Sequence, residues 1–192
     1  MLRSVPPFNL DIPAIICGSA PCLATDLAAV GAWNSNLTII AVNDAWREVR
    51  PDMLVGYEVE SVLVHARGAA ERWGRCFTTH APAWPAATAR DGIDHFWVDD
   101  THDQSGTSTM FAVKIAKAIG FSPIILCGAP LLGGDGYIDG VEDDHGFGRV
   151  APGSFEVNHA HNAWLRAREA GRLHGVYSMS GFTRDLLGLP PS

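Results

Sequence analysis

The stretch TSTMFAVKIAKAIGFSPIILC, at residues 107–127, carries the two signals that decide the fold. Apolar residues recur at spacings of three and four over residues 107–119, which predicts an amphipathic helix that ends at Gly120. Residues 123–127 are apolar at nearly every position, and this predicts a strand that is buried on both faces. A helix followed directly by such a strand is typical of a parallel sheet covered by helices.

The same alternation of strand-like and helix-like segments runs along the rest of the chain. We expect further strands at 12–17, 37–42, 52–57, 75–79, 95–98 and 175–179, and further helices at 23–32, 61–73 and 158–171. The sequence therefore predicts an α/β protein in which residues 1–192 form one domain, a doubly wound, mainly parallel, Rossmann-like sheet.

Composition narrows the class of protein. Hydrophobic residues make up 47% of the chain and charged residues 18%, which is typical of a globular domain. The net charge of -7 argues against a broad nucleic-acid or anionic-membrane surface.

No apolar run approaches the ~20 residues of a membrane span, and the first residues lack a signal-peptide core, so we expect a cytoplasmic protein. An open sheet has free edges, which makes a homo-oligomer an option.

Polar and small residues gather where predicted strands end. Gly18, Ser19 and Ala20 lie between the first strand and a helix, in the stretch IICGSAPCL. Such a turn lets backbone N–H groups approach a phosphate or sugar, although its spacing matches neither GxGxxG nor GxxxxGK[ST]. A tight strand-to-helix turn without a ligand is the alternative interpretation.

Two more segments have the same double interpretation. Asn43 follows the second strand, and its amide can pair with a base or ribose or can cap a helix. Ser105, Gly106 and Thr107 precede the helix at 107–119, and this position suits either an anion or plain capping. A Gly/Asp-rich loop at about 133–153 follows a core strand, which favours a functional loop over a solvated insertion.

Together these motifs resemble a known group of proteins. The segments IICGSAPCL, IIAVNDAW and QSGTSTMFAVKIAKAIGFSPIILCGAPL are similar to the bacterial sialyltransferases of glycosyltransferase family 42. They also resemble related Rossmann-like proteins, namely motility-associated glycosyltransferases and the archaeal-type 6-hydroxymethylpterin diphosphokinase. The resemblance extends over about residues 12–180. It departs from the family pattern at Cys22, where a serine is usual, and at Pro130, where an acidic residue is common.

The resemblance implies a nucleotide-dependent transferase, most simply a glycosyltransferase whose substrate is a nucleotide-activated sugar donor, with an acceptor as second partner. By position, the nucleotide would be bound by the small residues of the first turn, the polar residue after the second strand and the turn before the central helix; these are Gly18, Ser19, Ala20, Asn43, Ser105, Gly106 and Thr107. Glu58, Trp46 and Arg149 are candidate substrate contacts. The resemblance implies no firm cofactor.

A histidine general base is also implied by the resemblance, since imidazole titrates near neutral pH. The candidates are His161 first, then His159 and His145.

Two alternatives to a glycosyltransferase stay open. A diphosphokinase-like transferase would need Mg²⁺, for which Asp143 and Asp144 are the candidate ligands. A non-catalytic nucleotide- or sugar-binding protein would keep the fold without the chemistry. A compact, acidic chain of this kind suits a bacterial or phage protein.

Overall fold

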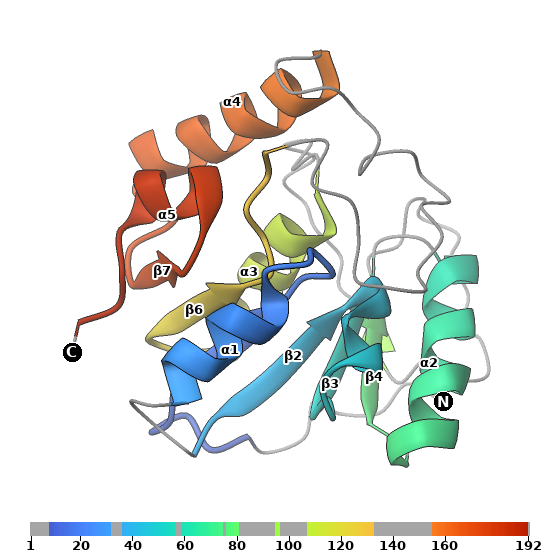
Figure 1. Cartoon of the computed structure of the whole chain (residues 1–192). Coiled ribbons are helices and arrows are strands. Elements are labelled where there is room, and N and C mark those ends of the chain that lie inside the picture. The colour runs from blue at the N-terminus through green and yellow to red at the C-terminus, as the bar shows by residue number, and fades with distance from the viewer. Residues whose placement is uncertain are drawn as a thin grey trace.

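A single parallel sheet organises the molecule. The computed structural model describes residues 8–31, 36–56, 59–74, 76–80, 95–96, 107–132 and 155–191. Within them a seven-stranded sheet has the order β5-β4-β3-β2-β1-β6-β7, and every neighbouring pair is parallel (Figure 1). The strands are β1 (Ala14–Cys17), β2 (Thr38–Val42), β3 (Met53–Gly56), β4 (Phe77–His80), β5 (His95–Phe96), β6 (Ile124–Cys127) and β7 (Val176–Ser178). The predicted doubly wound α/β class is confirmed.

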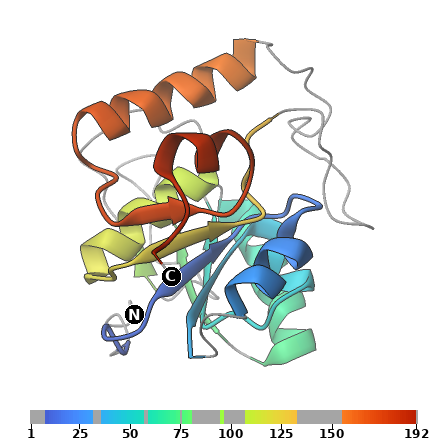
Figure 2. The ribbon, with the colours of Figure 1, turned by 60° about the vertical axis from the view of Figure 1, so that its left-hand side comes forward.

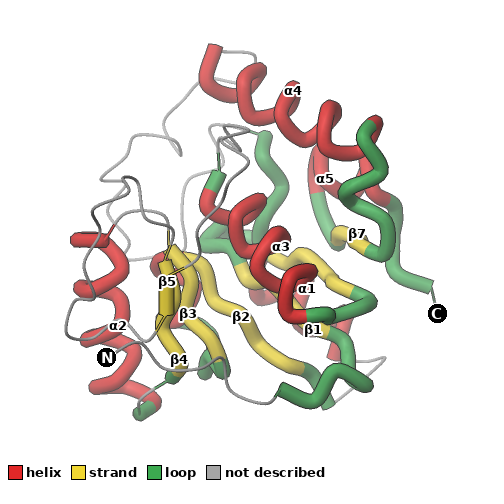
Figure 3. The backbone as a smooth tube through the Cα atoms, turned by 180° about the vertical axis from the view of Figure 1, so that it is seen from behind, coloured by secondary structure: helices red, strands yellow, loops and turns green. Residues whose placement is uncertain are grey.

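Helices cover both faces of this sheet. One face carries α1 (Leu23–Gly31), α2 (Val59–Trp73) and the short 3-10 helix η1 (Asn43–Arg47). The other face carries α3 (Ser108–Ile119), α4 (Phe155–Glu169) and α5 (Gly181–Leu187). Figure 2 shows α4 and α5 beside β7, and Figure 3 shows α2 at the opposite end of the sheet. Two of these elements, η1 and α5, were not predicted by the periodicity of the sequence.

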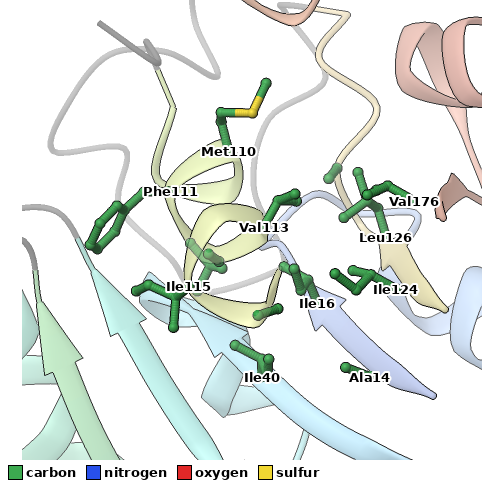
Figure 4. Packing of buried hydrophobic residues seen from close by; sticks show 14 of the residues in the cluster. Ala14, Ile16, Ile40, Met110, Phe111, Val113, Ile115, Ile124, Leu126 and Val176 are labelled. Carbon is green, nitrogen blue, oxygen red and sulfur yellow. The ribbon is translucent and has the colours of Figure 1, made fainter. Parts of the chain in front are cut away.

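The core has two layers because strand residues alternate between faces. Ile15 and Cys17 pack beneath α1 and η1, while Ala14 and Ile16 face α3. Figure 4 shows the second layer, in which Ile115 of α3 lies over the sheet among its aliphatic side chains. All four residues of β1 are fully buried, which explains why its sequence is apolar without alternation.

The central helix begins and ends where the sequence predicts. The Thr107 hydroxyl accepts a hydrogen bond from the Met110 N–H at 3.1 Å and caps the first turn of α3. Gly120 ends the helix in the left-handed conformation, with φ 109°. Both ends of α3 are therefore fixed by local chemistry.

The sheet edge at β7 is closed by the chain itself. The outward N–H of Val176 donates to the Leu173 carbonyl at 3.1 Å, and that of Ser178 donates to the Gly188 carbonyl at 3.0 Å. The segment after α5 therefore covers this edge strand. None of the helices in the described ranges has the length and apolarity that crossing a bilayer requires.

Candidate functional site

The topology singles out one place at the carboxyl edge of the sheet. The strand order reverses at β1, because the chain first builds β2 to β5 on one side and then adds β6 and β7 on the other. In open α/β sheets, ligands bind outside the carboxyl ends of the strands at such a reversal. The chain leaves the sheet there at Gly18, Asn43 and Gly128, the first residues after β1, β2 and β6.

The turn after β1 is held tightly against the end of β6. The Gly18 N–H donates to the Cys127 carbonyl at 2.8 Å, and the Ala20 N–H donates to the Gly128 carbonyl at 3.1 Å. A Cβ on Gly18 would lie 2.3 Å from the Gly128 carbonyl oxygen, so glycine is required here by the contact of two backbones. The amides of Gly18 and Ala20 are therefore used within the protein. Ser19, only 9% exposed, makes no hydrogen bond within the described part of the chain.

Asn43 joins three elements at the same edge. Its backbone has a φ of 49°, a left-handed conformation that asparagine tolerates better than most residues. Its side-chain N–H₂ group lies 3.5 Å from the Ser108 hydroxyl at the start of α3. Its amide oxygen would lie 3.3 Å from a Cβ on Gly56, the last residue of β3. The structure thus brings the segment after β2 close to the start of α3, through Ser108, which was not among the predicted nucleotide-binding residues.

Thr107 and Trp46 serve structural contacts. The Thr107 oxygen caps α3, although its own O–H remains able to donate. The Trp46 indole lies against α2, where a Cβ on Gly68 would be 2.5 Å from the ring. Its N–H donates to His65 Nδ1 at 3.3 Å. This packing accounts for Trp46 without a ligand, and the role of Trp46 in substrate contact stays a prediction.

A cluster of ionisable groups next to Asn43 was missed by the sequence reasoning. The Asp44 carboxylate lies 2.9 Å from Arg47 Nε and 3.6 Å from His65 Nδ1. His65 is only 12% exposed and Asp44 only 16%. The sequence indicates this cluster only through the Asn43-Asp44 pair after β2, because His65, the partner of Asp44 on α2, belongs to no recognisable motif.

Of the candidate histidines, His161 has defined surroundings. Its ring stacks on Phe182 of α5, with 3.8 Å between ring centroids and 9° between planes. Its Nε2 hydrogen-bonds the carbonyl of Leu131, beyond the end of β6. A carbonyl only accepts, so Nε2 carries a proton, and in the neutral imidazole the lone pair is then on Nδ1. His159 lies on the same helix, two residues away, and is half-buried.

The loop after β6 is held from several sides. Asp26 Oδ2 accepts from the Gly128 N–H at 2.8 Å, Thr183 Oγ1 donates to the Ala129 carbonyl at 2.7 Å, and the Phe182 N–H donates to the Pro130 carbonyl at 2.9 Å. Pro130 itself packs on Gly181, where an added Cβ would lie 2.4 Å away. The helix α5 therefore fixes this loop, although the sequence reasoning did not predict α5.

Several candidate residues lie outside the described residues, as does the loop at 133–153: Glu58, Ser105, Gly106, Asp143, Asp144, His145 and Arg149. Among the described residues, no group of three or more His, Cys, Asp or Glu side chains is arranged to hold a metal ion. The roles proposed for these residues stay predictions.

No family model and no curated protein sequence matches this chain. Among solved structures, it is similar to the MAf glycosyltransferase from Magnetospirillum magneticum AMB-1, with a TM-score of 0.58 and 16% identity over 100% of this chain and 35% of that chain. It is also similar to the sialyltransferase CstII from Campylobacter jejuni in complex with a substrate analogue, cytidine-5'-monophosphate. That TM-score is 0.62, with 13% identity over 96% of this chain and 87% of that chain. The fold is that of these glycosyltransferases. This chain spans only 35% of the MAf protein's length.

Proposed function

We propose that the protein is a nucleotide-dependent transferase, and specifically a glycosyltransferase that uses a nucleotide-activated sugar donor. The observation that carries the proposal is the meeting of Asn43 and Ser108 at the carboxyl edge, beside the strand reversal. The structural likeness to two glycosyltransferases supports it, and one of them was determined in complex with cytidine-5'-monophosphate.

Asn43 is the residue best suited to hold the nucleotide. Its amide offers both an acceptor and a donor, which a base edge or a ribose can use together. Its left-handed backbone is a conformation that costs free energy and is found more often at functional positions than elsewhere. Ser108 adds a hydroxyl from the other side, at the start of α3.

His161 is the proposed general base. Its Nδ1 takes the proton of the acceptor hydroxyl while that oxygen attacks the anomeric carbon of the donor. The bond from the anomeric carbon to the phosphate oxygen breaks, and the nucleotide leaves with the bonding electron pair. The contacts of His161 with Leu131 and Phe182 fix the ring and its tautomer. His159 and His145 remain the alternatives for this role.

Thermal-shift and calorimetric titrations with CMP, UDP, GDP and ATP, each with and without Mg²⁺, test the proposal. Binding of CMP or a nucleoside diphosphate without Mg²⁺ supports glycosyl transfer. Binding of ATP alone, and only with Mg²⁺, points instead to the diphosphokinase-like reaction. Binding without turnover of any nucleotide sugar, even by hydrolysis, identifies a non-catalytic binding protein.

Asn43→Gly is the sharpest variant for the nucleotide site. Glycine adopts the left-handed backbone without strain, so this change removes the amide and leaves the turn intact. We expect the nucleotide dissociation constant to rise ~10-fold or more while the melting temperature stays close to wild type. Asp185→Asn, on the exposed surface of α5, serves as the control and should change neither. Unchanged nucleotide affinity in Asn43→Gly would remove Asn43 from the site.

A further inference from the structure

A buried carboxylate binds the residue after β6 that contacts the turn following β1. Asp26 is on the first turn of α1 and is only 6% exposed. Its Oδ2 accepts two hydrogen bonds of 2.8 Å, from the Gly128 N–H and from the Ser180 hydroxyl. Neither the proposed donor contacts nor the proposed base uses this residue.

These contacts place a fixed negative charge where a Rossmann-like fold ordinarily receives a phosphate. The amino end of the helix after β1 attracts anions because its free N–H groups carry partial positive charge. Here the first turn of α1 contains the carboxylate of Asp26, which accepts a hydrogen bond from the Gly128 N–H just after β6. The amides of Gly18 and Ala20 donate to backbone carbonyls, so these two donors are not available to an anion.

The negative charge of Asp26 affects the ionisation of the cysteine thiols at the ends of β1 and β6. Burial raises the pKa of the Cys17 thiol to about 12, and the negative charge of Asp26 adds to this effect. The pKa of Cys127 is likewise raised, first by burial and then by repulsion from neighbouring groups that include Asp26. The negative charge of Asp26 therefore disfavours a second negative charge close to it.

We propose that Asp26 is a specificity-determining residue that keeps phosphate groups away from the turn after β1, so that this turn receives an uncharged polar part of the ligand. Sugar hydroxyls or the polar edge of a base are the chemical classes concerned. Ser19 supplies the hydroxyl that pairs with them, since it makes no hydrogen bond within the described residues and is nine-tenths buried. The identity of the ligand rests on the proposed function, whereas the exclusion of phosphate does not.

Asp26→Asn tests the exclusion with inorganic pyrophosphate as the probe. Asparagine keeps an oxygen that can accept from Gly128 and Ser180, and it removes the charge. By isothermal titration calorimetry, we expect pyrophosphate to bind the variant ~10-fold or more tightly than wild type, because charges a few ångströms apart inside a protein repel strongly. Asp185→Asn removes one charge from an exposed position and should leave pyrophosphate affinity unchanged. A purely structural Asp26 would lower the melting temperature in the variant and give no gain in affinity, which overturns the proposal.

A measurement on the wild-type protein covers the case in which the variant does not fold. Millimolar pyrophosphate should leave the backbone amide NMR signals of residues 18–20 unshifted, while a free nucleoside that binds should shift them. Shifts of these amides with pyrophosphate overturn the proposal. If no nucleotide or nucleoside binds wild type, the proposed function fails. The pyrophosphate results then still decide the role of Asp26.

Discussion

Replacing Gly18 with alanine tests whether the turn after β1 is held by direct contact of two backbones. The added Cβ would lie 2.3 Å from the Gly128 carbonyl oxygen, where ordinary contact begins at 3.4 Å. The two segments must therefore separate by 3.4 minus 2.3, about 1.1 Å. Neither atom belongs to a flexible side chain, so only the ends of β1 and β6 can move.

The expected cost follows from what this movement breaks. The bonds from the Gly18 N–H to Cys127 and from the Ala20 N–H to Gly128, at 2.8 Å and 3.1 Å, would both exceed hydrogen-bond distance. Two lost hydrogen bonds cost ~1–3 kcal/mol and overpacking costs ~1–3 kcal/mol, so we expect the free energy of unfolding to fall by ~3 kcal/mol. For a chain of this size that is a decrease in melting temperature of ~6–12 °C.

Urea denaturation of purified Gly18→Ala measures this change without any ligand. Gly31→Ala is the matched control, because a Cβ at Gly31 meets nothing within 4 Å at the end of α1. We expect the control to be as stable as wild type or up to ~1 kcal/mol more stable. A Gly18→Ala protein within ~0.5 kcal/mol of the Gly31→Ala protein would refute the backbone-contact reasoning.

Three further changes have defined outcomes. His161→Ala should lower kcat for glycosyl transfer ~100-fold or more and change donor affinity much less; equal turnover would eliminate this base. Thr183→Val should reduce the free energy of unfolding in urea by ~1–3 kcal/mol, because it leaves the buried Ala129 carbonyl without its donor. The raised pKa values of Cys17 and Cys127 mean that the unfolded chain loses thiol protons at lower pH than the folded one. Stability should therefore fall as pH rises above ~8.5, by up to ~1.4 kcal/mol per pH unit for each thiol; a flat profile from pH 8 to 10 contradicts this.

The order of strands and helices was predictable because each signal is local. The helix at 107–119 and the strand at 123–127 were recognised from periodicity and from the glycine between them, and both are confirmed with small differences at their ends. The strands predicted at 12–17, 37–42 and 175–179 extended one or two residues too far, whereas β4 continues to His80, one residue beyond its predicted end. Pairing with neighbouring strands decides where a strand begins and ends. The helix α5 has only seven residues, too few for a clear periodic pattern.

The candidate site was predictable only in part, since its contacts join residues far apart in the chain. Asn43 was recognised from its place after a buried strand, but its partner Ser108 is 65 residues away. Asp26 has the sequence context of an ordinary surface carboxylate on a helix. Its carboxylate is hydrogen-bonded to Gly128 and Ser180, which are 102 and 154 residues away, and no local sequence pattern indicates these contacts. Long-range partners of this kind emerge only once the fold is known.

The self-capped edge at β7 bears on how copies of this protein can associate. A second chain that extends a sheet needs the outward N–H groups of an edge strand as donors. Val176 and Ser178 already give theirs to carbonyls of their own chain. A dimer built across this side would therefore have to rely on side chains, and a continuous intermolecular sheet there would first require the tail after α5 to detach.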